Sequence, residues 1–371
     1  MLKSLSDAPI RANRRFNICD LATAQTPDQA SAAGRQIGLL HSDLRLAPLI
    51  LSDAAVQLWI ESRSRDRLLT GSDFGDNNEI ARLILDGAFE VKIGAAFASG
   101  ADAWDVVFDG ASEYCAAGRI SSLSVRALQY GQSALSRNDV VLANRLYAYN
   151  RLPASPSQRR QFPGADSVRK ALRIDDHGPT SLLLREFWSP AENAGWLLWT
   201  KRESDDATFG HSHKLYLSPM PEALPDIFRR CVEVLTDSVA TTFKIGRDLY
   251  GLMRPDKFVA YFSSAESLSQ TAEKLKTILG GVPAHGTPFT AALSEDGLLA
   301  WGMDPPRSVR ASPSEGASWR HWIVRRLARA LIIAQSSQHR TIEPWRFAMA
   351  RLSLDGVEPE TWTPLRKLWA D

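Results

Sequence analysis

Cysteine is scarce and widely scattered in this sequence. The 371 residues contain only three cysteines, Cys19, Cys115 and Cys231, and none of them forms a Cys-x-x-Cys pair. An odd number of distant cysteines argues against a disulfide framework and against a zinc site. We therefore expect reduced thiols and a cytoplasmic protein that needs no structural metal.

Long apolar segments are also missing. No apolar run is long enough to cross a bilayer, and the longest lies around residues 331–334. Basic residues near the N-terminus are not followed by an apolar segment, so the pattern does not predict a secretory signal peptide. We expect no membrane partner.

The sequence has no excess of charge of one sign. Its 44 Lys and Arg residues balance 42 Asp and Glu residues, for a net charge of +2 at pH 7. This balance creates no broad electrostatic field that would attract nucleic acid or an anionic membrane. Any recognition of an anion must therefore be local.

Familiar catalytic signatures are absent too. There is no P-loop, dinucleotide-binding fingerprint, Gly-x-Ser-x-Gly elbow or protein-kinase signature. Asp73, Asp76 and Glu79 lack the spacing of a calcium loop, and we interpret them as the entry to a helix. With 44% hydrophobic and 23% charged residues, the composition is that of a globular protein with a large core.

The apolar pattern changes character near residue 150. Before this point, after a polar and loosely ordered start over residues 1–35, apolar residues recur mainly at helical spacing. The predicted helices there include 103–117, 121–135 and 139–149. The prolines of Arg151-Leu-Pro-Ala-Ser-Pro then mark a connection. We expect a helical N-terminal region, 1–150, and a second domain, 151–371.

Strands and helices are mixed in the second half. Alternating or apolar runs predict strands over 181–188, 196–202, 214–218, 241–246, 257–262 and 298–302. Helical periodicity predicts helices over 222–239, after the capping pair Ser263 and Glu266, and over 319–334. The connections are too irregular for a doubly wound sheet. We expect an α+β fold with a mixed or antiparallel sheet.

Strand alternation predicts that five polar side chains share one face of this sheet, while their apolar neighbours point to the other face. These side chains are Lys214, Tyr216, Lys244, Lys257 and Tyr261. Arg254 would lie at the edge of the same surface. Such a face is either an ordinary solvated surface or a local anion-binding site.

A family resemblance favours an anion-binding site. Phe243-Lys-Ile-Gly followed by Arg254-Pro-Asp-Lys-Phe-Val-Ala-Tyr resembles the lyase domains of class III and IV lanthipeptide synthetases, and Lys214-Leu-Tyr-Leu-Ser is similar to their lysine-x-histidine strand. Phosphothreonine lyases among type III effectors share this order. Tyr147-Ala-Tyr-Asn and Ser318-Trp-Arg-His-Trp are similar to segments of Hop-type effectors and their relatives in class V lanthipeptide and thioamitide pathways. The resemblance covers about residues 145–350.

The resemblance implies β-elimination without a metal or cofactor. Phosphate would leave phosphoserine or phosphothreonine, and dehydroalanine or dehydrobutyrine would remain. Lys244 would be the base, because burial and neighbouring cations keep an amine neutral. The implied phosphate-binding residues are Lys214, Arg254, Lys257, Tyr261 and Arg320. By pattern alone, Arg320 could instead belong to a solvated basic helix face.

The general acid departs from the family pattern. Tyr216 stands where the family carries a histidine, and tyrosine can donate a proton, particularly if cations lower its pKa. His211 and His213, just before the strand, are alternatives, although His213 is also readable as a surface histidine. The missing histidine is equally consistent with a fold that binds phosphopeptide without catalysis.

The function that the resemblance implies is a lyase of lanthipeptide-type biosynthesis. Its substrate would be a precursor peptide phosphorylated by a separate Ser/Thr peptide kinase, and the helical region would bind the kinase or the peptide leader. Two alternatives stay open: a type III secreted effector of the same fold acting on a host phosphoprotein, and a non-catalytic phosphopeptide-binding module.

Overall fold

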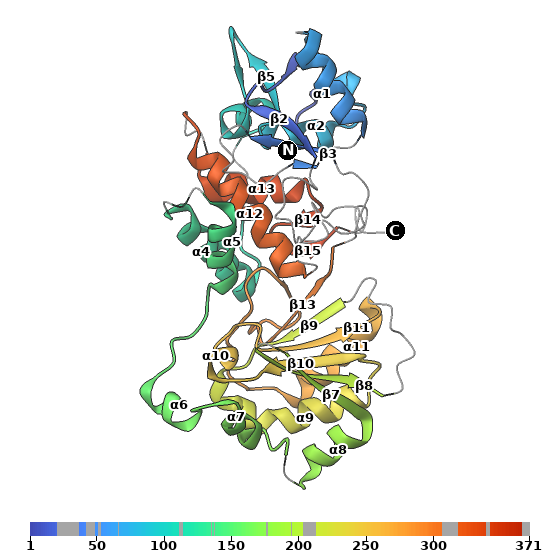
Figure 1. Ribbon diagram of the computed structural model, residues 1–371, viewed down its shortest axis with the longest axis vertical. Helices are drawn as coiled ribbons and strands as arrows, with labels where there is room; N and C mark the ends of the chain where they lie inside the picture. Colours follow the sequence, from blue (N-terminus) through green and yellow to red (C-terminus); the bar gives the residue numbers. More distant parts are fainter. Residues whose placement is uncertain are drawn as a thin grey trace.

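A computed structural model gives the structure of most of the chain. It describes residues 1–20, 37–41, 49–50, 53–65, 67–110, 114–134, 136, 138–175, 177–193, 195–202, 213–305, 318–338 and 342–365. The molecule is elongated, with the N-terminal elements at one end and a large sheet near the other (Figure 1). The C-terminal helices lie between these two parts. Helices and antiparallel sheets make this an α+β fold, which confirms the predicted class.

The large sheet has seven strands in the order β12-β13-β9-β11-β10-β8-β7, and every neighbouring pair is antiparallel. The strands are β7 (Trp188–Asn193), β8 (Trp196–Lys201), β9 (His213–Leu217), β10 (Thr242–Gly246), β11 (Phe258–Phe262), β12 (Ala291–Ala292) and β13 (Leu299–Met303). Five of the predicted strands, which correspond to β8, β9, β10, β11 and β13, therefore form its centre.

Helices cover one face of this sheet. They include α9 (Leu224–Thr236) and α11 (Ala265–Ile278), whose apolar sides pack on inward side chains such as Phe243, Ile245 and Phe258. Each of these three side chains is fully buried, and such burial stabilises the fold by about 1.5–3 kcal/mol per residue. Alternation then sends Lys244 to the opposite face.

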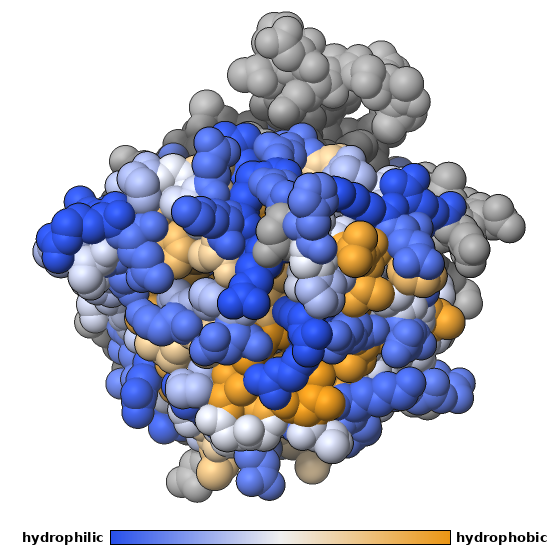
Figure 2. Space-filling view, turned by 90° about the horizontal axis from the view of Figure 1, so that it is seen from below, coloured by the Kyte–Doolittle hydropathy of each residue, from blue (hydrophilic) through white to orange (hydrophobic). Residues whose placement is uncertain are grey.

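Shorter helices surround this sheet: α6 (Pro156–Gln161), α7 (Ala165–Ala171), α8 (Pro179–Phe187) and α10 (Leu249–Leu252). Figure 2 shows the end of the molecule where α8 lies, which is largely hydrophilic around a central apolar area. Leu182 and Phe187 of α8 are exposed apolar side chains. This end is remote from the C-terminal helices (Figure 1).

The other part of the molecule combines small sheets with helices. Its strands are β1 (Ile10–Ala12), β2 (Phe16–Asp20), β3 (Ile37–His41), β4 (Leu49–Ile50), β5 (Phe89–Ile93) and β6 (Ala96–Ala98). Its helices are α1 (Asp53–Arg65), α2 (Asn77–Leu85), α3 (Trp104–Val107), α4 (Gly118–Gln132) and α5 (Asp139–Ala148). From the C-terminal end it receives α12 (Trp319–Gln335), α13 (Pro344–Ser353), β14 (Val357–Glu358) and β15 (Thr363–Pro364).

The hydrophobic core of this part crosses the predicted boundary at residue 150. A single cluster of buried side chains extends from Leu5 to Trp362 and includes both α12 and α13. Helix α12 is buried on more than one side, so it needs partners around it, and it packs against α4, α5 and α13. The chain leaves this core near residue 150 and returns to it at Phe289 and then at α12.

Some local predictions were wrong. Residues 10–12 and 16–20 form strands rather than a loose start, because Ile10 and Ala12 pair with β5 from far along the chain. Residues 181–187 are helical, since Gly178 and Pro179 begin α8 there. In the described part of the predicted helix 103–117, only α3 and a preceding 3₁₀ turn form. Helices 121–135 and 139–149 correspond to α4 and α5.

Among the described residues, no helix combines the length and the apolar character needed to cross a membrane.

Candidate active site

The free face of the large sheet carries the predicted polar side chains. Lys214 on β9 pairs with Tyr261 on β11, and Tyr216 pairs with Val259, which in turn pairs with Lys244 on β10. Paired residues in antiparallel strands point to the same side. The structure therefore brings together four side chains on what we call the basic face: Lys214, Tyr216, Lys244 and Tyr261.

Helices of the other part lie over this face. Ile120 of α4 packs against Tyr216, and Trp319 at the start of α12 bonds to the segment that follows β13. Both α4 and α12 also contact the strands at the β12 edge. The basic face is thus located at the junction between the sheet and the helices, where side chains from distant parts of the chain meet.

Lys244 is held between aromatic rings. Its amine lies 4.3 Å from the centre of the Trp196 ring and 5.5 Å from that of Tyr261. Among the described residues, it has no hydrogen bond or ion pair to an acceptor. Burial lowers the pKa of Lys244 to about 8, and Lys214 and Arg254 act in the same direction, against two nearby carboxylates. A useful fraction of this amine is therefore neutral near pH 7.

Lys214 is fixed by a carboxylate. Its amine lies 2.6 Å from Oδ1 of Asp304, and the Lys214 side chain is only 9% exposed. The same oxygen accepts a hydrogen bond from the backbone N–H of Trp319 at 3.0 Å. Asp304 therefore connects β9 to the first turn of α12 and holds a positive charge near Lys244.

Arg254 is fixed in the same manner by Asp256. Its Nε donates to Oδ1 at 2.8 Å and its Nη2 to Oδ2 at 3.0 Å. The guanidinium carbon lies 4.7 Å from the centre of the Trp196 ring, which Lys244 also contacts. This two-point contact orients the guanidinium, so Arg254 presents its charge at a defined place beside the base candidate.

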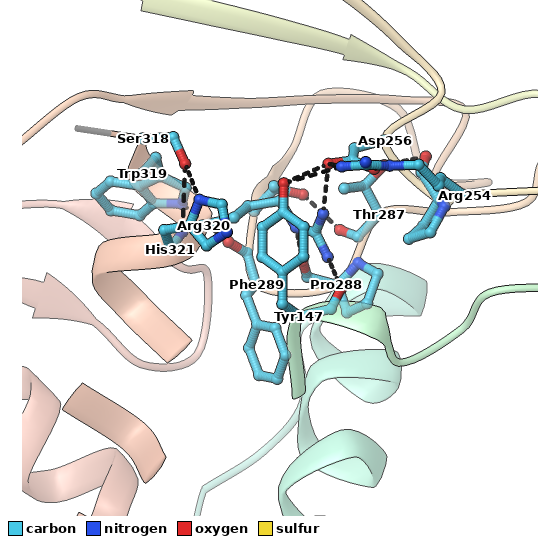
Figure 3. A network of polar contacts seen from close by, with 12 residues as sticks. Tyr147, Arg254, Asp256, Thr287, Pro288, Phe289, Ser318, Trp319, Arg320 and His321 are labelled. Atoms are coloured by element: carbon cyan, nitrogen blue, oxygen red, sulfur yellow. Dashed lines mark hydrogen bonds and ion pairs between the residues drawn. The ribbon is translucent and has the colours of Figure 1, made fainter. Parts of the chain in front are cut away.

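Asp256 is the centre of a larger network (Figure 3). The hydroxyl of Tyr147 on α5 donates to Oδ2 of Asp256 at 2.8 Å and accepts from Nη2 of Arg254 at 3.1 Å. Arg320 on α12 adds an ion pair at 2.8 Å. Burial alone would raise the pKa of the Asp256 carboxyl, but Arg320, Arg254 and Tyr147 outweigh it and hold that pKa well below its usual range.

Arg320 is used inside the protein. Its side chain is 1% exposed, its Nε donates to the carbonyl oxygen of Pro288 at 3.1 Å, and its Nη2 donates to that of Tyr147 at 2.9 Å. With the Asp256 ion pair, these contacts attach α12 to α5 and to the sheet. Arg320 is therefore buried behind Asp256, which also binds Arg254, and it does not lie on a solvated helix face.

Lys257 also lies away from the other lysines. Its side chain is fully buried, and its amine bonds to the carbonyl oxygen of Pro219 at 2.9 Å and to Nδ1 of His285 at 2.7 Å. Nε2 of His285 in turn contacts the carbonyl oxygen of Asn150 at 2.5 Å. Burial lowers the pKa of Lys257 to about 7. These contacts join the sheet to the segment that follows α5.

The buried amine of Lys257 predicts a stability that depends on pH. Its pKa is about 7 in the folded protein and about 10.4 in an unfolded chain. Between these values the unfolded chain binds more protons, so stability rises with pH, by up to about 1.4 kcal/mol per pH unit. We expect the free energy of unfolding, measured with urea, to gain about 1 kcal/mol from pH 7 to pH 8 relative to Lys257→Met, because the folded-state amine is still half protonated at pH 7. Equal pH slopes in both proteins would contradict the assignment.

Tyr216 and His213 differ from the expectation for a general acid. Cations do not lower the pKa of Tyr216 below its usual value, because burial raises this pKa well above that value and Asp304 adds to the effect. His213 alternates to the other face of the sheet, where it lines a cavity of about 710 Å³ together with Leu268 and Trp301. His211 lies outside the described residues.

Comparison with known proteins gives distant structural similarity. No family model and no curated protein matches the sequence. An effector protein from Pseudomonas syringae pv. tomato strain DC3000 is 14% identical with a TM-score of 0.42, over 66% of this chain and 98% of that one. One from Pseudomonas syringae pv. syringae strain 61 is 16% identical with a TM-score of 0.41, over 67% and 99%. The type III effector and phosphothreonine lyase OspF from Shigella flexneri is 16% identical with a TM-score of 0.28, over 43% and 86%. These values assign neither a family nor an activity to this chain.

Four further residues of the site emerge only from the structure. Asp256 and Asp304 fix the two cations, and Tyr147 bonds to both members of the Arg254–Asp256 pair. His321 stacks on the Tyr147 ring, with centroids 4.1 Å apart and planes 5° from parallel. Tyr147 and His321 belong to the motifs on which the family resemblance rests, so that resemblance could have pointed to these two residues. Nothing in the local sequence pointed to Asp304.

Proposed function

We propose that this protein is a lyase that eliminates phosphate from phosphoserine or phosphothreonine in a peptide. The observation that carries the proposal is the environment of Lys244, an amine with a pKa of about 8 and no acceptor among the described residues, beside two fixed cations. A base must be neutral to accept a proton, and its pKa should lie near the working pH.

The arrangement of charges suits a phosphate ester. Three cations, Lys214, Arg254 and Arg320, accompany two carboxylates, Asp256 and Asp304, so the site keeps an excess of positive charge even when Lys244 is neutral. Because the carboxylates hold Lys214 and Arg254 in place, little reorganisation is needed when negative charge develops on the leaving phosphate. Tyr261 lies between Lys214 and Lys244 and completes the surface.

In the proposed reaction, Lys244 removes the proton from Cα of the phosphorylated residue. The electron pair of that C–H bond forms the double bond between Cα and Cβ, and the bond between Cβ and oxygen breaks. Lys214 and Arg254 bind the phosphate group and stabilise its charge as it leaves. The product is dehydroalanine from phosphoserine or dehydrobutyrine from phosphothreonine.

We further propose a cytoplasmic role on a precursor peptide that a separate Ser/Thr peptide kinase has phosphorylated, as in lanthipeptide-type biosynthesis. An effector that acts on a host phosphoprotein uses the same chemistry, so turnover of an intact phosphoprotein in preference to peptides would select that role.

Tyr216 favours a second candidate function, because its raised pKa makes it a poor acid. That candidate is a module that binds phosphopeptide without turnover.

The direct test uses synthetic phosphoserine and phosphothreonine peptides with the full-length protein. We expect loss of phosphoric acid in the mass spectrum, followed by addition of a thiol reagent to the new double bond. The unphosphorylated peptide is the control and should keep its mass. Binding of the phosphopeptide without any change of mass would select the binding module, and the absence of both would contradict the proposal.

A further inference from the structure

His321 lies close to the proposed phosphate-binding cations. It lies in the first turn of α12, directly after Arg320, and its imidazole stacks on Tyr147 at 4.1 Å. The Tyr147 hydroxyl bonds to both Arg254 and Asp256 (Figure 3). The stacked ring therefore extends the network around Arg254 by one more side chain, and this side chain remains exposed.

The tautomer of His321 is indicated by its neighbour Ser318. The Ser318 hydroxyl oxygen accepts from the backbone N–H of His321 at 3.4 Å and lies 3.1 Å from Nδ1 of the imidazole. When the hydroxyl donates to Nδ1, the ring proton is on Nε2. Among the described residues Nε2 has no partner, so it can offer a proton to a bound ligand.

The other histidines whose side chains the structure describes are not placed to donate a proton to a ligand on the basic face. His285 is engaged at both ring nitrogens, by Lys257 and by the carbonyl oxygen of Asn150. His213 points to the opposite face of the sheet. His177 precedes α8, which packs on α9 beneath that opposite face. His321 alone of this group lies beside the basic face.

The charges around His321 link its protonation to phosphate binding. Partial burial of the imidazole, together with Arg320 and the proposed phosphate ligands Arg254 and Lys214, lowers the pKa of His321 to about 4, while Asp256 opposes this effect. A bound phosphate dianion offsets the positive charges of these groups and raises the pKa of the imidazole. Phosphopeptide binding therefore favours the imidazolium, in which Nδ1–H donates to the Ser318 hydroxyl and Nε2–H is left for the ligand.

We propose that His321 is the general acid of the elimination, an inference that rests on the proposed function. Lys244 takes the proton from Cα, and the Cβ–oxygen bond breaks with its electron pair on the phosphate oxygen. Nε2 of the His321 imidazolium gives its proton to that oxygen, so hydrogen phosphate leaves and a neutral imidazole remains. One proton is gained by Lys244 and one is lost by His321, which keeps the total charge of the site constant.

The test compares two substitutions at position 321 in the full-length protein. His321→Ala removes the ring and leaves space, whereas His321→Phe keeps an aromatic ring on Tyr147 but has no proton to donate. We expect both variants to lower kcat for phosphopeptide elimination by about 10²-fold. Added imidazole should restore part of the rate of His321→Ala in a saturable manner, and it should not restore that of His321→Phe.

Three outcomes would overturn the role of His321. A rate of His321→Phe within about twofold of wild type would show that only stacking matters, since a lost general acid costs about 10²-fold or more. A slow His321→Ala protein with a native circular dichroism spectrum and no imidazole rescue would indicate a structural effect. A wild-type protein that eliminates no phosphate would reject the proposed function itself, and the role of His321 with it.

Discussion

Replacing Lys244 by alanine is expected to lower kcat/KM for phosphate elimination by about 10³- to 10⁴-fold, the upper part of the range for a lost general base. The reason is that among the described residues no other amine on the basic face lacks a carboxylate partner, since Lys214 is paired with Asp304. Elimination is followed by mass spectrometry of quenched reactions. In the His321→Phe variant, where no imidazole titrates, log kcat/KM should rise with a slope of about 1 below pH 8 and level off above it, as Lys244 loses its proton.

Two control substitutions separate the base from a general effect of charge. Lys244→Arg keeps the positive charge but cannot act as a base near pH 7, because the pKa of arginine exceeds about 12. It should be as inactive as Lys244→Ala. Lys274 is exposed on α11, and Lys274→Ala should react at the wild-type rate. Activity retained in Lys244→Ala would remove this residue from the mechanism.

Replacing Asp256 by alanine is expected to lower the free energy of unfolding by about 3–5 kcal/mol, the usual cost of removing one partner of a buried ion pair. Asp256 receives contacts from Arg254, Arg320 and Tyr147. Arg320 is 1% exposed, so its charge would stay buried without compensation. Urea denaturation of both proteins at pH 7 measures the difference.

The comparison variant for Asp256 is Asp7→Ala, an exposed carboxylate. Its effect on the free energy of unfolding should stay within about 0.5 kcal/mol. The contribution of the Asp256 carboxylate to the free energy of unfolding is complete above the pKa of an unfolded aspartate, about 3.9. This contribution is lost progressively as the pH falls below that value. The difference in the free energy of unfolding between wild type and Asp256→Ala should therefore become smaller at acidic pH. A loss below about 1 kcal/mol at pH 7 would contradict the role of the network.

Strand alternation was the part of the sequence that predicted most of the site. Lys214, Lys244 and Tyr261 alternate with large apolar residues, and burial of those apolar side chains against α9 and α11 forces the polar ones to the other face. The register between strands then follows, because a shift by one residue would turn every side chain around. Local pattern and tertiary packing agree here, so the prediction of a shared face holds.

Lys257 and Arg320 show where pattern alone was insufficient. Both were grouped with the phosphate-binding residues, yet their charged groups are enclosed by the carbonyl oxygens of Pro219 and Pro288 and by other side chains. Alternation specifies the face to which a side chain belongs, but it does not specify what covers that face. Here the cover consists of α4, α5 and α12, which lie between the large sheet and the N-terminal elements (Figure 1).

The sequence by itself determined the α+β class, the central strands and the face on which Lys244 lies, because these follow from side-chain periodicity over a few residues. Only the tertiary structure decided which carboxylates hold Lys214 and Arg254, and that His321 stacks beside them. Arg254 and Asp256 are close in the sequence, but Lys214 and Asp304 are 90 positions apart and Tyr147 and Asp256 are 109 apart. They depend on α12 returning to the N-terminal core, which is a consequence of packing that no local pattern records.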